Sequence, residues 1–308
     1  MVTLKELSTE ELFASGHRLC AGCGEGIINR MALKALRGPT IIVSATGCTE
    51  VASTVYPFTS WCVSWVHVAF ENAAAVASGV VEAYKAMARR GAWNKHVDVI
   101  AIAGDGGTYD IGLQALSGAL ERGHDFLYIC LDNEAYMNTG IQRSGATPHG
   151  AETTTSPAGS VISGKPEWKK DLIGICAAHG IEYAATACPA YWNDFITKVR
   201  KGIEVNGPAI IDVLSPCPLG WRHDSALGIK MVRLAVETRY FPVYEFERGK
   251  YKLNIKVPQP KPVEEFLKLQ GRFSHLFNPT YKKDIIDEIQ QNIDTNWSRI
   301  LKLCEQTQ

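Results

Sequence analysis

Two cysteines stand two residues apart in a glycine-rich segment near the start of the chain. The segment GHRLCAGCGEG runs from Gly16 to Gly26 and contains Cys20 and Cys23. Thiolates at this spacing hold a metal ion or a cluster, form a redox-active disulfide, or are ordinary thiols with no chemical role. Two cysteines are half of a four-ligand site, so the choice between these alternatives depends on whether the rest of the chain contains further ligands.

Two further cysteines follow predicted strands. Cys48 stands in ATGCTE and Cys217 in SPCPLGW. Four soft thiolates suit a cubane iron–sulfur cluster, although zinc also accepts a Cys₄ site. A thioredoxin-like redox pair normally follows a strand, and no strand pattern precedes Cys20. We therefore expect the four cysteines to meet at one rim of a sheet.

The other five of the nine cysteines fit a different interpretation. We interpret Cys130, Cys176, Cys188 and Cys304 as buried thiols. The role of Cys62 is left open, although the flanking tryptophans in SWCVSW favour core packing over ligation. An odd number of scattered cysteines indicates a reducing compartment rather than a disulfide scaffold.

A second group of polar residues follows two buried strands. The strand VIAIAG ends in Gly104, Asp105, Gly106 and Gly107, and the next strand, FLYICLD, is followed by Asn133. Glycines allow close approach of a phosphate, amides at a helix start favour an anion, and a carboxylate suits Mg²⁺. Alone, GDG is equally typical of a tight turn. In a parallel sheet, however, Asn133 would lie at the adjacent carboxyl end and face the same metal.

Strand and helix patterns alternate between residues 26 and 214, which predicts a doubly wound parallel sheet with ligands at the carboxyl ends of its strands. Apolar strands are predicted at 40–46, 97–104, 126–132, 181–187 and 209–215. Helices are predicted at 26–36, 71–90, 111–123, 172–180 and 192–204. The small-residue helix 71–90 packs either on its own sheet or on a partner chain.

The last third of the chain has a different character. The segment YEFERGKYKL predicts a hairpin, a proline-rich exit follows it, and residues 282–306 form an amphipathic pattern typical of a helix. We therefore predict an α/β domain over residues 1–215 and a C-terminal extension over 216–308, which carries the fourth cysteine and subunit contacts.

Charge and hydropathy exclude several classes of partner. The chain has 32 basic and 32 acidic residues and a pI near 7.1, so it lacks the basic surface that nucleic acids or anionic membranes require. No apolar run reaches the roughly 20 residues that span a bilayer, and the first residues lack the pattern of a signal peptide. We expect a cytoplasmic protein.

The motifs together resemble one enzyme family. GDG followed by Asn after a crossover helix is similar to the thiamine diphosphate motif. Combined with GHRLCAGCGEG, ATGCTEVASTVYPFTSW, AFENAAAVASG and SPCPLGW, it resembles the β subunits of the 2-oxoacid:ferredoxin oxidoreductases, of the pyruvate type. The resemblance extends in order over most of the chain, to YEFERGKYKL and LKLQGRFSHL near its end.

The resemblance implies roles for individual residues. Asp105, Asn133 and the carbonyl of Ala135 would bind Mg²⁺, with residues up to Asn138 against the reactive ring of the cofactor and Asn138 directed at the substrate-derived group. The remaining implied residues are Gly47, Gly104, Gly106 and Gly107 beside the cofactor, and Cys20, Cys23, Cys48 and Cys217 as ligands of a [4Fe–4S] cluster.

The resemblance also implies a reaction and partners. Pyruvate would be oxidatively decarboxylated with coenzyme A to acetyl-CoA and CO₂, and electrons would pass through the cluster to ferredoxin. The implied partners are an α chain that binds the pyrimidine ring, a chain that binds coenzyme A and a ferredoxin-like chain. The alternatives are another 2-oxoacid, such as oxalate or a branched-chain acid, and a non-catalytic iron–sulfur or zinc module.

Three polar residues near these motifs have no assigned role. We interpret His67 and Glu71 as structural by default, and Arg143 as a solvated loop residue, although it could approach a carboxylate or a coenzyme A phosphate.

Overall fold

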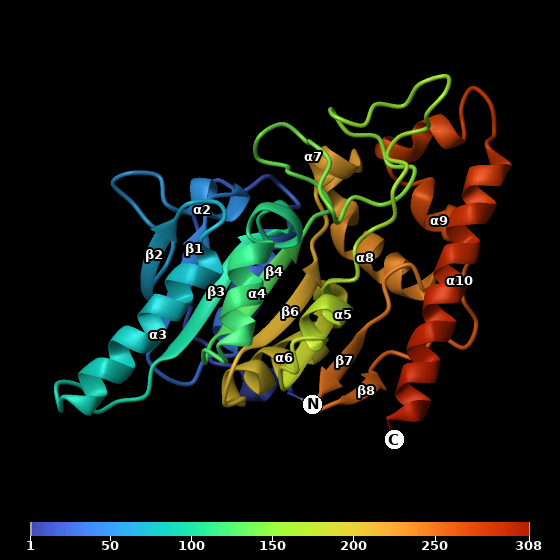
Figure 1. The fold of residues 1–308 in the computed structure, drawn as a ribbon. Coiled ribbons are helices and arrows are strands. Elements are labelled where there is room, and N and C mark those ends of the chain that lie inside the picture. Colours follow the sequence, from blue (N-terminus) through green and yellow to red (C-terminus); the bar gives the residue numbers. More distant parts are fainter. Residues whose placement is uncertain (1, 308) are drawn as a thin grey trace.

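The fold is built on a single eight-stranded sheet. A computed structural model describes residues 2–307, and the strands lie in the order β2-β1-β3-β4-β6-β5-β7-β8 (Figure 1). The strands are β1 (Thr40–Ala45), β2 (Ser64–Val68), β3 (Asp98–Gly104), β4 (Leu127–Asp132), β5 (Tyr183–Ala187), β6 (Ala209–Leu214), β7 (Tyr244–Glu247) and β8 (Lys250–Leu253).

Strands β1 to β6 are all parallel, which confirms the predicted doubly wound sheet. The predicted hairpin also forms, but it adds to this sheet, because β7 pairs antiparallel with β5 and then with β8. Residues from both sides of the predicted boundary at 215 therefore share one sheet. An independent unit at 1–215 stays a prediction.

Helices cover both faces of the sheet, and their apolar sides form its two main cores. One face carries α3 (Ala73–Arg89), α4 (Leu113–Glu121) and α5 (Leu172–Ala177), and the other carries α1 (Gly24–Lys34) and α6 (Trp192–Glu204). The small side of α3, which includes Ala73, Ala77 and Val81, is buried in the first core. The helix packs on its own sheet, the first of the two alternatives above.

The C-terminal region builds a third core beside the sheet, around residues such as Trp221, Phe266 and Phe273. Its helices are α7 (Pro218–Trp221), α8 (Gly228–Glu237), α9 (Val263–Leu267) and α10 (Lys283–Gln306), which runs along the side of the molecule (Figure 1). Short 3₁₀ turns complete the fold at η1 (Leu4–Glu6), η3 (Pro189–Tyr191), η4 (Ser225–Leu227) and η5 (Gly271–Leu276). No helix in the described part of the chain is long and apolar enough to cross a membrane.

Three elements near the site were not predicted from the sequence. The edge strand β2 was missed because most of its residues are exposed, so buried and exposed positions hardly alternate along it. Helix α2 (Cys48–Ser53) was missed because it is short. A turn of π-helix, η2 (Gly106–Ile111), separates β3 from α4. Because β2 and β3 lie on opposite sides of β1, the strand order reverses at β1, and such a reversal opens a crevice at the carboxyl ends.

Candidate active site

A pocket of about 320 Å³ lies at this crevice. Residues that follow β1, β3 and β4 line it, and these three strands are neighbours in the sheet. The predicted site residues in its wall are Gly47, Cys48, Gly104, Asp105, Gly106, Asn133, Ala135 and Asn138. The strand-end argument predicted that Asp105 and Asn133 would lie together, and both line this one pocket with Cys48, whereas Gly47, Ala135 and Asn138 were implied by the resemblance alone.

Asp105 follows β3 and is almost fully buried, with 1% of its surface exposed. Its Oδ2 accepts a hydrogen bond from Ser144 Oγ at 2.5 Å, whereas Oδ1 has no partner among the described residues. Burial raises the pKa of Asp105 to about 8, although the Ser144 hydrogen bond and the charge of Lys169 act to lower it. A nearby cation would favour the charged carboxylate.

Asn133 occupies the matching position after β4. Its side-chain nitrogen donates to Glu25 Oε1 at 3.0 Å, and its Oδ1 is buried without a partner in the described part of the chain. Adjacent strand ends thus present two unpartnered oxygens, Asp105 Oδ1 and Asn133 Oδ1, to one pocket. Oxygen atoms of this kind are the ligands that Mg²⁺ prefers, so the residues fit that ion.

Glu25 is a site residue that the sequence reasoning missed. It lies in the first turn of α1, is 3% exposed, and lines the pocket. Thr49 Oγ1 donates to Glu25 Oε2 at 2.6 Å, and Asn29 in turn donates to Thr49. Burial raises the pKa of Glu25. A glutamate at a helix start is usually a surface residue that favours the helix dipole, so the sequence carries no signal of its burial.

The glycines of the GDGG turn differ in their surroundings. Gly106 and Gly107 pack closely against other residues, whereas Gly104 has open space beside it. A Cβ atom at Gly106 would lie 2.5 Å from the Tyr136 ring, and one at Gly107 would lie 3.1 Å from the Phe70 carbonyl oxygen. A Cβ at Gly104 would meet no atom within 4 Å. Gly104 therefore borders open space in the pocket, whereas Gly107 lies behind the wall.

Cys48 lines the pocket, and the four predicted cysteines are close enough to interact electrostatically with one another. Burial raises the pKa of Cys217 to about 11, although backbone hydrogen bonds from Gly220 and Leu219 act to lower it. Burial likewise raises the pKa of the Cys23 and Cys48 thiols, with smaller contributions from Glu25 and the other cysteines. Ligation would require these thiols to lose their protons.

Backbone contacts join the two segments that carry Cys20, Cys23 and Cys217. The Gly24 amide donates to the Pro216 carbonyl at 2.9 Å. A Cβ at Gly22, which has a φ of +77°, would lie 2.2 Å from the Ser225 carbonyl oxygen. Within residues 2–307, no three His, Cys, Asp or Glu side chains converge closely enough to hold a single metal ion.

The remaining cysteines mostly follow expectation. Cys130, Cys176 and Cys188 are buried, as predicted, whereas Cys304 is only partly buried. Core packing, the interpretation favoured for Cys62, is wrong, because this side chain is exposed. It precedes the exposed edge strand β2, where the flanking tryptophans do not cover it.

Asn138 connects the pocket with the cysteines. It is exposed at the pocket wall. Burial raises the pKa of Cys48 and the charge of Glu25 adds to this, while a hydrogen bond with the Asn138 side chain lowers it. The side chain predicted to face the substrate therefore lines the same pocket as a predicted cluster ligand.

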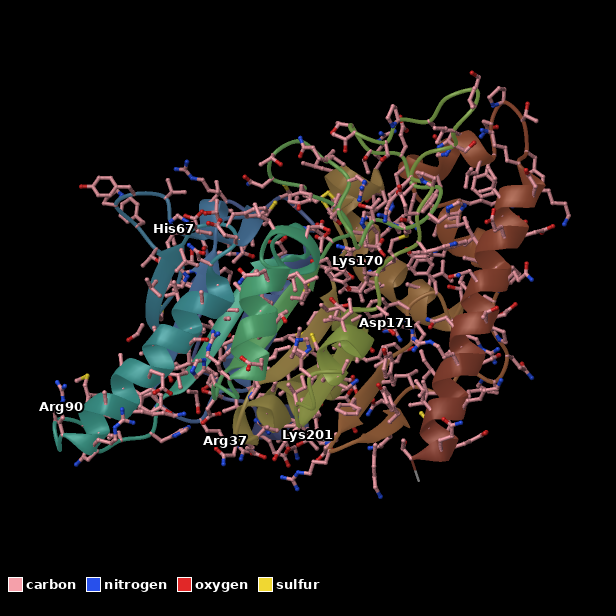
Figure 2. The ribbon with its side chains drawn as sticks, viewed as in Figure 1. Arg37, His67, Arg90, Lys170, Asp171 and Lys201 are labelled. Atoms are coloured by element: carbon pink, nitrogen blue, oxygen red, sulfur yellow. The ribbon has the colours of Figure 1, made fainter. Side chains whose placement is uncertain are left out.

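The three residues without an assigned role lie outside the pocket wall. His67 belongs to β2, and its Nε2 is 2.8 Å from Thr46 Oγ1 and 3.8 Å from Glu50 Oε2 (Figure 2). Glu71 is partly buried and Arg143 is exposed, with its backbone amide bonded to Thr155 Oγ1.

A larger cavity of about 520 Å³ lies between α5, the preceding loop and α10. Lys170 and Asp171 line it (Figure 2), and Asp171 pairs with Arg299 of α10 at 2.9 Å. None of the predicted site residues lines this cavity, so it is separate from the candidate site.

This combination of fold and site defines the class of thiamine pyrophosphate enzymes. Residues 45–213, more than half of the chain, match the family described as thiamine pyrophosphate enzyme, C-terminal TPP binding domain. A chain of 2-oxoglutarate:ferredoxin oxidoreductase from Magnetococcus marinus has the same fold, with a TM-score of 0.55, 21% identity, and coverage of 74% of this chain and 81% of that one.

Relatives of higher sequence identity show which family of thiamine pyrophosphate enzymes the chain belongs to. Pyruvate synthase subunit PorB of Methanocaldococcus jannaschii is 56% identical over 92% of this chain and 95% of its own, and PorB of Thermotoga maritima is 48% identical over 99% and 98%. Ketoisovalerate oxidoreductase subunit VorB of Pyrococcus furiosus is 47% identical over 96% and 94%. The chain belongs to the family of 2-oxoacid:ferredoxin oxidoreductase β subunits.

Proposed function

We propose that the chain is the catalytic β subunit of a pyruvate:ferredoxin oxidoreductase. The assembled enzyme oxidatively decarboxylates pyruvate with coenzyme A, yields acetyl-CoA and CO₂, and passes electrons through a [4Fe–4S] cluster to ferredoxin. The observation that carries the proposal is the pair of unpartnered oxygens, Asp105 Oδ1 and Asn133 Oδ1, in a pocket that Cys48 and Asn138 also line.

In this proposal Asp105, Asn133 and the carbonyl of Ala135 hold Mg²⁺, and the ion holds the cofactor diphosphate. The Asn133 and Glu134 carbonyls already accept hydrogen bonds from Trp221 and Thr147. No hydrogen bond to the buried Ala135 carbonyl is found within residues 2–307. Of the carbonyls of Asn133, Glu134 and Ala135, that of Ala135 is therefore the one available to a cation. Gly47, Gly104 and Gly106 line the pocket and provide the close approach that phosphates need, and Gly107 supports the turn from behind the pocket wall.

Cys20, Cys23, Cys48 and Cys217 bind the cluster in this proposal. A cubane is wider than a single ion and takes its thiolates at separate corners. Four cysteines without a histidine suit a cubane cluster, and a structural Cys₄ zinc site is the alternative that metal analysis separates from it.

Bound thiamine diphosphate supplies the electron sink for decarboxylation. The chain positions it and surrounds its reactive end. Asn138 faces the substrate-derived group from the pocket wall, and its hydrogen bond to Cys48 places that group next to the cluster ligands. A short distance between the two centres is what transfer of single electrons requires.

Partner subunits complete the enzyme. The sheet of the described residues matches a family described as a C-terminal TPP binding domain, and the proposal assigns the pyrimidine-binding domain to a partner. We expect an α chain in this role, together with a coenzyme A-binding chain and a ferredoxin-like chain. No role for nucleic acid or membrane is proposed, and the cytoplasm is the proposed location.

The experiment is an assay of the complex, purified without oxygen, with a panel of 2-oxoacids, coenzyme A and ferredoxin. Pyruvate should have the highest kcat/KM, and the preparation should be brown and contain iron and thiamine diphosphate. A preference for another 2-oxoacid would overturn the choice of pyruvate. A colourless, zinc-loaded preparation would overturn the cluster.

A branched-chain 2-oxoacid is the second candidate, because VorB relatives match almost as well as several PorB relatives. The same panel separates the two candidates when it includes ketoisovalerate, and oxalate tests the remaining alternative. A non-catalytic metal module would bind no thiamine diphosphate and would leave the Asp105 and Asn133 oxygens without a function.

A further inference from the structure

The turn that carries the proposed cation ligands has an unusual backbone at its centre. Glu134, between Asn133 and Ala135, has a φ of +68° and is fully buried. Residues other than glycine adopt this left-handed conformation at a cost, and it persists where surrounding contacts impose it. The turn must therefore be held by groups outside it.

The Glu134 side chain has three partners, and two come from the C-terminal region. Arg272 Nη2 donates to Oε2 at 2.5 Å, Tyr240 donates to Oε1 at 2.9 Å, and Lys169 Nζ lies 3.2 Å from Oε1. Arg272 is 2% exposed and belongs to η5. A buried glutamate with these partners cannot rotate away without leaving charges unpaired, which proteins avoid.

Arg272 is itself held in a fixed orientation. Its Nε donates to Gln270 Oε1 at 2.9 Å, and its guanidinium lies 4.5 Å from the centre of the Trp221 ring. The Trp221 Nε1 donates to the Asn133 carbonyl at 2.8 Å. One buried group of C-terminal residues therefore holds both the side chain of Glu134 and the backbone before it.

Taken together, these contacts leave the turn with one conformation. The Asn133 and Glu134 carbonyls accept hydrogen bonds from Trp221 and Thr147, and the residue after the left-handed Glu134, Ala135, lines the pocket. We propose that Glu134 and Arg272 form a positioning pair that presets the cation-binding turn, so that the C-terminal region controls cofactor affinity. The inference rests on the proposed Mg²⁺ site.

The test measures binding rather than turnover. The complex is stripped of thiamine diphosphate and Mg²⁺ with a chelator, and the cofactor is titrated back at a series of Mg²⁺ concentrations while tryptophan fluorescence is followed. For Arg272→Met and Glu134→Gln we expect about 10- to 100-fold weaker cofactor binding, as for other residues that orient metal ligands, and a higher Mg²⁺ requirement. Arg272→Lys, which keeps the positive charge, should recover most of the affinity.

A matched control separates positioning from stability. Lys198→Met breaks another buried ion pair, with Asp194 at 2.7 Å, and Lys198 does not line the pocket. This control should lower the urea midpoint as the Arg272 change does and leave the Mg²⁺ requirement unchanged. Since Glu134→Gln keeps the volume of the side chain, it carries the test if Arg272→Met is not recovered folded.

Two results would count against different parts of the account. If the wild-type complex binds thiamine diphosphate equally well without Mg²⁺, the proposed cation site is wrong. If the wild type needs Mg²⁺ but Glu134→Gln and Arg272→Met bind the cofactor with wild-type affinity and Mg²⁺ dependence, the positioning pair is wrong and the cation site stands.

Discussion

Asp105 and Asn133 each keep one buried oxygen without a hydrogen-bond partner among the described residues. A buried acceptor that is left unsatisfied costs about 1 to 3 kcal/mol, and more if it is charged. Two such unsatisfied acceptors lie in one pocket, at the ends of the neighbouring strands β3 and β4. Sites at which a fold accepts such a cost are typically functional.

Substitution can test the proposal that four cysteines bind a cluster while the buried cysteines Cys130, Cys176 and Cys188 only pack in the core. Changing any one of Cys20, Cys23, Cys48 or Cys217 to Ala should remove most of the bound iron and the visible absorbance, because a cubane needs all four corners. Cys176→Ala is the control, since this thiol is fully buried in the core. Iron analysis of anaerobic preparations makes the comparison. Full iron content in a Cys48→Ala preparation would contradict the assignment.

Gly104 allows cofactor binding and folding to be separated. A methyl group here would meet no protein atom within 4 Å, yet Gly104 lines the pocket. For Gly104→Ala we expect the free energy of unfolding to stay within about 1 kcal/mol of wild type. Thiamine diphosphate should bind about 10- to 100-fold more weakly, as overpacking predicts. The measurements are urea unfolding and calorimetry, and unchanged affinity would exclude Gly104 from the diphosphate site.

The sequence predicted those site residues whose position follows from a strand end. Asp105, Asn133, Cys48 and Cys217 all follow apolar runs, and parallel strands end at one edge. Glu25 was missed, because its role depends on burial by Thr49 and Asn133 rather than on any local pattern. Sequence spacing alone does not show which surface-type residue becomes buried.

At the scale of elements, the sequence predicted the strands that consist of continuous apolar runs. It did not predict the edge strand β2 or the pairing of the hairpin with the sheet. β2 is mostly exposed and short, so it lacks both the alternation and the apolar run that identify a strand. The hairpin was predicted from its sequence, but its attachment to β5 depends on pairing between residues about 60 positions apart, such as Tyr183 and Glu247. No local pattern encodes such a pairing.

The attachment of the hairpin depends on one buried carboxylate. Glu245 of β7 accepts hydrogen bonds from Lys252, Lys201 and Tyr183. Burial alone would raise the pKa of Glu245, but the hydrogen bonds and charges of Lys252 and Lys201 lower it from 4.5 to about 2. As the pH falls below 4.5 the unfolded chain takes up a proton before the folded one, so this stabilisation is present above pH 4.5 and is lost toward pH 2.

Glu245→Gln should therefore reduce the free energy of unfolding by about 2 kcal/mol at neutral pH. The difference from wild type should shrink as the pH falls from 4.5 to about 2. Urea unfolding followed by circular dichroism across this range provides the measurement. A difference that is independent of pH would show that the carboxylate charge is not what stabilises the hairpin.

At the scale of the whole molecule, distant parts of the chain build one site. Cys20 and Cys23 come from the N-terminal segment, Asp105 and Asn133 from the sheet, and Cys217 from beyond β6. The motifs predicted each part, and the resemblance predicted their assembly. The contribution of Arg272 to the turn at Glu134 appears only in three dimensions, since the two residues are 138 positions apart.

This organisation predicts the outcome of a truncation. A chain that ends at residue 215 would lack β7, β8, Cys217 and the buried residues Trp221 and Phe273 that close the third core. We expect it to lack a cooperative unfolding transition and to bind no cluster. Circular dichroism and thermal unfolding decide the point. A folded 1–215 fragment would instead support a separate α/β domain at the predicted boundary.

The central claim is that Asp105 holds the Mg²⁺ of a thiamine diphosphate site beside an iron–sulfur cluster. The most direct measurement is calorimetric titration of thiamine diphosphate, with and without Mg²⁺, into chelator-stripped complex that carries Asp105→Ala. Ser144→Ala is the matched control, because it removes the hydrogen bond to Asp105 Oδ2, along with contacts to Ala146 and Thr147, and leaves the carboxylate in place. It should lose about tenfold in affinity.

For Asp105→Ala we predict at least about 100-fold weaker binding of thiamine diphosphate, as expected when a metal ligand is lost. The added effect of Mg²⁺ should be absent, and the iron content and visible spectrum of the cluster should be unchanged. Mg²⁺-dependent binding of wild-type strength in the Asp105→Ala complex would contradict the account.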